Sequence, residues 1–146
     1  MKRIIPLSPR RWLALEIFRR MKRERIEEHP LRQLFWECTL RCNVRCSHCG
    51  SDCKSSPSTP DMPLEDFLKV LDSIATHTDP HNVFVIISGG EPTVREDLET
   101  CAKEISRRGY PWGMVCNGLY LTRQRLHNLI RNGMSCLLYT SDAADD

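Results

Sequence analysis

A cluster of closely spaced cysteines is the strongest chemical signal in this chain. Cys42, Cys46 and Cys49 form the pattern C-x3-C-x2-C. Thiolates hold zinc ions or iron–sulfur clusters, and an iron–sulfur cube held by only three thiolates leaves one iron open to a small chelating molecule. A structural zinc site needs four ligands, and His48 or Cys53 could supply the fourth. Both kinds of metal site stay open on the spacing alone.

A second segment of chemical interest is SGGEP, at positions 88–92. It directly follows the apolar, β-branched run VFVII, which is typical of a strand buried on both faces. Glycine has no Cβ, so backbone groups in this segment can approach a ligand closely. A Gly-Gly pair by itself is also an ordinary turn, so the segment gains meaning only from its neighbours.

The elements that must position these residues alternate along the chain from residue 31 onwards. The predicted strands are residues 31–38, 83–87 and 112–116. The predicted helices are residues 63–77, 97–108 and 122–132, with Thr122 as the cap of the last one. This order predicts an α/β fold with parallel strands, either an open doubly wound sheet or part of a barrel. In both folds, the loops that follow neighbouring strands meet at one mouth, so the cysteines and SGGEP should lie close together.

The two motifs, in this order and after these strands, resemble those of the radical SAM superfamily. The resemblance implies an amino-terminal half of a partial (βα)6 barrel over residues 30–135. It implies that Cys42, Cys46 and Cys49 hold a [4Fe–4S] cluster whose fourth iron is chelated by S-adenosylmethionine. The residues expected to contact the methionine end of that cofactor are Ser88, Gly89, Gly90 and Glu91. His48, near the adenine, and Asn117, at the end of the third strand, are weaker candidates.

The resemblance also implies a reaction. An electron from an external donor cleaves S-adenosylmethionine, and the resulting 5′-deoxyadenosyl radical removes a hydrogen atom from the substrate. The longer stretches HPLRQLFWECTLRCNVRCSHCGSDCK and PWGMVCNG resemble SPASM-related and lipoprotein-associated radical SAM enzymes, which modify peptides or proteins. We therefore expect a peptide or protein substrate. The alternative is a small zinc-binding module that binds a partner without catalysis.

Composition and the pattern of apolar residues predict the cellular compartment and argue against a secreted or membrane-spanning protein. The 146 residues are 40% apolar and 27% charged, as in ordinary globular chains. The first 20 residues do not form a signal peptide, and no run reaches the roughly 18 apolar residues of a membrane span. The chain has eight cysteines, several of them closely spaced, and no signal peptide. This combination predicts a reducing, cytoplasmic compartment. The sequence contains no nucleic-acid-binding motif. Cys38 and Cys53 are expected to be buried thiols.

The two ends of the chain differ from its middle. Nine of the 21 Lys and Arg residues lie in the first 28 positions. Apolar residues there recur at spacings of three and four, which predicts a basic amphipathic helix within residues 1–29. It would pack on the domain or contact lipid, nucleic acid or a partner. Residues 136–146, CLLYTSDAADD, resemble a translated sequencing adaptor, and we expect them to be a non-native, disordered tail that leaves residues 112–116 as an exposed edge strand.

Overall fold

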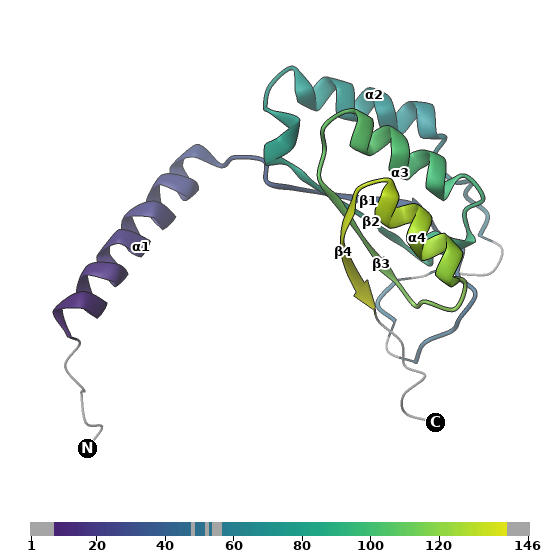
Figure 1. Cartoon of the computed structure of the whole chain (residues 1–146), viewed down its shortest axis with the longest axis horizontal. Coiled ribbons are helices and arrows are strands. Elements are labelled where there is room, and N and C mark those ends of the chain that lie inside the picture. Colours follow the sequence, from purple (N-terminus) through teal and green to yellow (C-terminus); the bar gives the residue numbers. More distant parts are fainter. Residues whose placement is uncertain (1–7, 48, 52, 54–56, 140–146) are drawn as a thin grey trace. The chain divides into compact units, whose positions relative to one another are not determined.

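The protein forms two units, Met1–Pro30 and Leu31–Asp146. A computed structural model describes residues 8–47, 49–51, 53 and 57–139 (Figure 1). Both motifs of chemical interest belong to the second unit. Among the described residues, no helix combines the length and the apolar character needed to cross a membrane.

The first unit contains the helix α1, Pro9–Glu28. The prediction of a helix here is confirmed, but the prediction that it is amphipathic is wrong. Successive helical residues are about 100° apart around the axis. Trp12, Leu13, Leu15 and Phe18 therefore point to different sides of the helix and form no single apolar stripe. The spacings of three and four were real, but intervening apolar residues at other spacings cancel the pattern.

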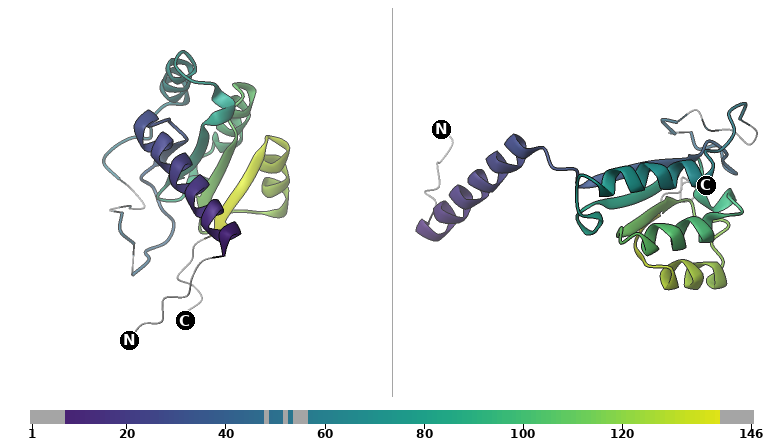
Figure 2. Two further views of the ribbon diagram at one scale, coloured as in Figure 1. Left: turned by 90° about the vertical axis from the view of Figure 1, so that its left-hand side faces the viewer. Right: turned by 90° about the horizontal axis from the view of Figure 1, so that it is seen from above.

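The second unit is one parallel four-stranded sheet in the order β1-β2-β3-β4. The strands are β1 Gln33–Thr39, β2 Phe84–Gly89, β3 Trp112–Cys116 and β4 Met134–Tyr139. The α-helices are α2 Leu64–Ala75, α3 Leu98–Arg107 and α4 Arg123–Arg131, and two short 3-10 helices are η1 Pro80–Asn82 and η2 Pro92–Val94. Because strand order follows chain order, right-handed crossovers place all three helices on one face of the sheet. Figures 1 and 2 show α2, α3 and α4 side by side on that face.

The predicted α/β fold with parallel strands is confirmed. The third predicted strand has the same bounds as β3, and Thr122 caps α4 by accepting a hydrogen bond from the backbone N–H of Arg125 at 3.2 Å. The other predicted elements differ from the observed ones by one or two residues at their ends, where helices and strands fray.

The prediction for the end of the chain is wrong in part. β4 pairs along the whole of β3, so residues 112–116 are not an edge strand, and Cys136–Tyr139 are ordered rather than disordered. The side chains from Ser135 to Tyr139 are all exposed. β4 therefore joins the sheet through its backbone more than through packing, which is why its short apolar run was not recognised as a strand. Residues 140–146 lie outside the described part of the chain.

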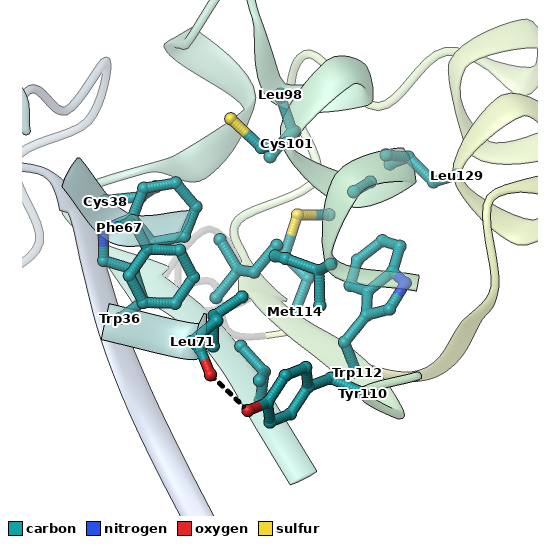
Figure 3. Packing of buried hydrophobic residues seen from close by; sticks show 14 of the residues in the cluster. Trp36, Cys38, Phe67, Leu71, Leu98, Cys101, Tyr110, Trp112, Met114 and Leu129 are labelled. Carbon is teal, nitrogen blue, oxygen red and sulfur yellow. Dashed lines mark hydrogen bonds between the residues drawn. The ribbon is translucent and has the colours of Figure 1, made fainter. Parts of the chain in front are cut away.

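The core lies between the sheet and its helices (Figure 3). Alternate residues of the strands face the helices, so Trp36, Val85, Ile87 and Met114 are all buried. The rings of Trp36 and Phe67 are stacked with their centroids 3.9 Å apart. The Tyr110 hydroxyl lies within this apolar layer and donates to the Leu71 carbonyl at 2.7 Å. The opposite face of the sheet is more open, and Phe35 in β1 is 61% exposed.

A buried arginine, Arg95, holds the end of β1 through hydrogen bonds. The Arg95 side chain is 4% exposed, and its guanidinium donates to the two carboxylate oxygens of Asp97 at 2.9 and 2.8 Å. It also donates to the carbonyls of Cys38 and Met62, at 2.5 and 3.1 Å. It lies 5.3 Å from the centroid of the Trp36 ring. One side chain thus joins β1, the segment before α2 and the start of α3.

We expect Arg95→Ala to destabilise the protein by about 2–4 kcal/mol, because it leaves the buried Cys38 carbonyl without its donor and removes the buried partner of Asp97. Arg107→Ala is the matched control, since that side chain is 71% exposed and pairs with Glu104 at 3.4 Å. The control should change stability by less than about 1 kcal/mol. Urea unfolding of both variants checks this, and equal midpoints would contradict it.

Candidate functional site

Two backbone hydrogen bonds join the segment after β1 to the segment after β2. The first segment, residues 40–53, is called the cysteine loop below. The second, residues 88–92, begins with the last two residues of β2 and is called the GGEP loop. The Gly90 N–H donates to the Thr39 carbonyl at 2.9 Å, and the Glu91 N–H donates to the Arg41 carbonyl at 2.9 Å. These bonds carry the pairing of β1 with β2 past the ends of both strands, so the two motifs start side by side as the topology predicted.

The glycines of the GGEP loop allow this close approach. An added Cβ at Gly90 would lie 2.3 Å from the Arg41 carbonyl oxygen and 3.2 Å from the Cβ of Cys42. An added Cβ at Gly89, where φ is +130°, would lie 2.3 Å from the Thr39 carbonyl oxygen. From the sequence we expected these glycines to make room for a ligand. The structure gives a different reason, because the space beside both Cα atoms is filled by the backbone of the segment that follows β1.

The Glu91 carboxylate is buried and fully hydrogen-bonded. One oxygen, Oε1, accepts from the backbone N–H and the hydroxyl of Thr93, at 3.0 and 2.5 Å. The other, Oε2, accepts from the backbone N–H of Asn117 at 2.6 Å. The side chain is 1% exposed. Glu91 therefore caps η2 and also joins the end of β2 to the end of β3, which brings a third loop into the site.

A polar cluster fixes the start of the cysteine loop. The Thr39 hydroxyl donates to one carboxylate oxygen of Asp61 at 2.6 Å, and Arg41 donates to the other at 2.5 Å. The Thr39 hydroxyl also accepts from the backbone N–H of Arg41 at 3.0 Å. Burial by itself would raise the pKa of Asp61, but the hydrogen bonds from Thr39 and Arg41 outweigh it and hold that pKa below its usual range. The carboxylate therefore stays charged at neutral pH.

These three loops surround one cavity of about 500 Å³ at the carboxyl ends of the strands. Its lining combines the two predicted motifs and the end of β3. The residues that line it are Cys42, Val44, Arg45, Cys46, Cys49, Ser51, Cys53, Gly89, Gly90, Glu91, Val115, Cys116 and Asn117. Ligand sites of α/β sheets are expected at this end of the strands.

The three cysteines of the C-x3-C-x2-C pattern share this cavity but do not converge. Cys42 and Cys46 are half-buried and Cys49 is exposed. Among the described residues, no three His, Cys, Asp or Glu side chains are arranged to hold a metal ion. The donor set still fits an iron–sulfur cluster, because three thiols on one loop line one cavity. Glu91, the only acidic residue in the described part of its lining, is already hydrogen-bonded.

The remaining cysteines divide into two kinds. Burial raises the pKa of the Cys38 and Cys101 thiols to about 12, so both are neutral at physiological pH. Burial likewise raises the pKa of Cys116. The prediction that Cys38 is a buried thiol is confirmed. The same prediction is wrong for Cys53, which is only half-buried and lines the cavity with the three motif cysteines.

Some of the other predicted site residues lie at the cavity and others do not. Asn117 lines the cavity as expected, whereas Ser88 does not and lies in β2. His48 lies outside the described residues. Sequence reasoning missed Asn43, whose side-chain oxygen accepts from the amide nitrogen of Asn117 at 2.8 Å. Its place directly after the first motif cysteine was the available signal, but the sequence did not show its partner 74 positions away.

Comparison with protein families finds a match over residues 36–146 to the model of the radical SAM superfamily. Curated relatives are also similar. Fe-coproporphyrin III synthase from Methanosarcina barkeri is 30% identical over 68% of this chain and 24% of that protein. PqqA peptide cyclase from Bradyrhizobium diazoefficiens is 32% identical over 67% of this chain and 25% of that protein. The chain thus spans about a quarter of the length of these relatives.

Solved structures of Streptococcus suis SuiB have the same fold over most of this chain. The structure bound to S-adenosylmethionine has a TM-score of 0.56 and 16% identity, covering 86% of this chain and 29% of SuiB. The structure bound to the precursor peptide SuiA has a TM-score of 0.55 and 15% identity, covering 88% and 29%. At this identity the likeness establishes the fold, and the four parallel strands correspond to part of a barrel.

Gly90→Ala should destabilise the protein by about 1–3 kcal/mol, because the new methyl group would overlap the Arg41 carbonyl and push the cysteine loop away from β2. Gly50→Ala is a matched control within the cysteine loop, since nothing lies within 4 Å of the Cβ position there. Thermal or urea unfolding compares the two variants. Equal stability of both would show that the two loops are not held in contact.

Alkylation should distinguish the two kinds of cysteine. In the folded, metal-free protein at pH 8, iodoacetamide should modify the exposed Cys49 and leave Cys38 and Cys101 unmodified, because a pKa of about 12 and burial leave almost no accessible thiolate. Mass spectrometry of peptides checks this. In urea all three should react, and modification of Cys38 at a similar rate without urea would contradict its burial.

Proposed function

The chain belongs to the radical SAM superfamily, and we propose that its cysteine loop binds a [4Fe–4S] cluster while its GGEP loop binds S-adenosylmethionine. The observation that carries this proposal is the shared cavity, which Cys42, Cys46 and Cys49 line from one side and residues 89–91 line from another. Thiolates are the ligands that iron–sulfur clusters take in proteins. With the cluster and cofactor bound, the site would supply reductive cleavage of the sulfonium and a 5′-deoxyadenosyl radical for hydrogen abstraction.

The contacts of the GGEP loop suggest how it would bind the cofactor. The N–H groups of Gly90 and Glu91 already donate to Thr39 and Arg41, so the loop offers the cavity acceptors rather than donors. Carbonyl oxygens suit the ammonium group of a methionine. The Glu91 carboxylate has no such freedom, because both its oxygens are hydrogen-bonded within the protein. In this proposal Glu91 shapes the loop and its side chain makes no bond to the cofactor.

The side of the cavity formed by β3 would complete the pocket. Val115 and Cys116 contribute apolar and weakly polar surface, and Asn117 contributes an amide. Burial keeps the Cys116 thiol neutral, so it adds no charge near a cationic sulfonium. A neutral thiol is a poor nucleophile, so this wall would not attack the sulfonium as a thiolate would. Asn117 remains a proposed cofactor contact, as does His48.

For the whole protein we propose a peptide substrate. Two of the similar proteins support it by name, PqqA peptide cyclase and SuiB bound to its precursor peptide. A porphyrin substrate is the second candidate, because Fe-coproporphyrin III synthase is similar to this chain at nearly the same identity. Either reaction would need an external electron donor and a reducing, cytoplasmic environment, which suits a loop of closely spaced thiols.

Removing any one of the three motif cysteines tests the proposal. After anaerobic reconstitution, the wild-type chain should contain about four iron and four sulfide per chain, as a cube requires. Cys42→Ala, Cys46→Ala and Cys49→Ala should each lose most of both, together with the visible absorption of the cluster. Cys101→Ala is the control, because that buried thiol lies in α3 and does not line the cavity.

The same analysis separates this function from a zinc-binding module. A module of that kind would bind about one zinc per chain in air and give no brown chromophore. Iron retained at the wild-type level in Cys46→Ala would refute the assignment of the cluster. Binding of S-adenosylmethionine by calorimetry should then require the reconstituted wild-type protein and should be absent in the three cysteine variants.

A further inference from the structure

The orientation of the Asn117 amide is fixed by a donor that cannot be reversed. The side-chain oxygen of Asn117 accepts from the backbone N–H of Leu119 at 3.1 Å. A backbone N–H is always a donor, so the acceptor must be the amide oxygen and the amide nitrogen must point the other way. The backbone of Asn117 is itself held by the Glu91 carboxylate at 2.6 Å. The direction of this amide therefore does not depend on the usual ambiguity between oxygen and nitrogen.

The same logic fixes Asn43. The amide nitrogen of Asn117 is a donor, and it lies 2.8 Å from the side-chain oxygen of Asn43. The acceptor atom of Asn43 is therefore its side-chain oxygen. Its Nδ2 takes no part in this hydrogen bond. Nδ2 is buried, and it has no hydrogen-bond partner in the part of the chain that the structure describes. A buried donor left unpaired is energetically unfavourable, so a ligand that accepts from it is expected.

The position of this orphaned donor suggests what it binds. Asn43 lines a second pocket that shares Cys42 with the large cavity. Its partner Asn117 lines the large cavity itself. Thiolate and sulfide sulfurs accept hydrogen bonds, and such bonds to the sulfurs help to set the reduction potential of an iron–sulfur cluster. Resting on the proposed function, we propose that Asn43 donates its Nδ2 hydrogen to a sulfur of the cluster. Asn43 would thus tune the potential of the cluster, and Asn117 would hold it in position.

The direction of the effect follows from charge. Reduction adds an electron to the cluster, so a donor to its sulfurs stabilises the reduced form more than the oxidised form. Removing the donor should therefore lower the midpoint potential. Asn43→Asp keeps an oxygen for Asn117 but replaces the donor by an acceptor, and Asn43→Leu removes the donor without adding charge. Together they separate the loss of the hydrogen bond from the effect of a negative charge.

The test is a redox titration of the reconstituted chain, followed by electron paramagnetic resonance of the reduced cluster. We expect both Asn43 variants to keep wild-type iron and sulfide. In Asn43→Leu the ratio of reduced to oxidised cluster at a fixed potential should be about tenfold lower, which is a shift of about 59 mV for one electron. In Asn43→Asp it should be lower still, because the added negative charge also opposes reduction. Asn117→Leu should shift the ratio in the same direction. Asn82→Leu should leave it unchanged, because Asn82 is exposed in η1 before β2 begins.

The other possible results would contradict either this inference or the proposed function. Unchanged potentials in Asn43→Leu and Asn43→Asp, with iron retained, would overturn the inference while leaving the proposed function intact. Loss of iron in both variants would also overturn it, because Asn43 would then hold the cysteine loop in place rather than tune the cluster. A wild-type chain that takes up no iron or sulfide would refute the proposed function itself, and the inference would fall with it.

Discussion

The site depends on one buried carboxylate, that of Glu91. Its two oxygens receive hydrogen bonds from the residues that follow β2 and from the backbone that follows β3, and its own N–H reaches the segment that follows β1. A buried charge is tolerated only when it is fully hydrogen-bonded, so these bonds are a condition for burying it at all. The geometry of all three loops is therefore set together. One residue thus joins the ends of three strands around the cavity, β2 and β3 through its side chain and β1 through its backbone N–H.

Two arginines, the buried Arg95 and the half-buried Arg125, hold the segments beneath the loops through hydrogen bonds. Arg95 holds the end of β1 through the Cys38 carbonyl. Arg125, in α4, donates to the carbonyls of Thr93 and Arg95 at 2.5 and 2.9 Å and pairs with Glu99 at 2.6 Å. The guanidinium group has several donors in a fixed plane, which lets one side chain satisfy carbonyls from separate segments. Two buried nitrogens of the described residues lack a hydrogen-bond partner, Trp36 Nε1 in the core and Asn43 Nδ2 in the cysteine loop.

Much of this could be predicted from the sequence because it depends on local patterns. The buried run VFVII, the cap at Thr122 and the spacing of Cys42, Cys46 and Cys49 all follow from properties of neighbouring residues. The chain order of the strands then placed the two motifs together. What could not be predicted depends on partners far apart in the chain. These are the space beside Gly90, the bonds of Glu91 and the link between Asn43 and Asn117, which all involve contacts between separate loops. β4 joins the sheet more through backbone pairing than through packing, since Met134 is its one partly buried residue.

The register of the sheet implies an order of assembly. β2, β3 and β4 are joined by short connections, since Val85 pairs with Trp112 and Trp112 with Met134, whereas Gln33 of β1 must find Phe84 across the cysteine loop and α2. Closing a longer loop costs more entropy, so the β2–β4 segment can form first and β1 can join it later. The thiols would then remain outside a nearly finished scaffold until the last closure. Under the proposed function, a cluster bound at that stage would hold β1 against β2.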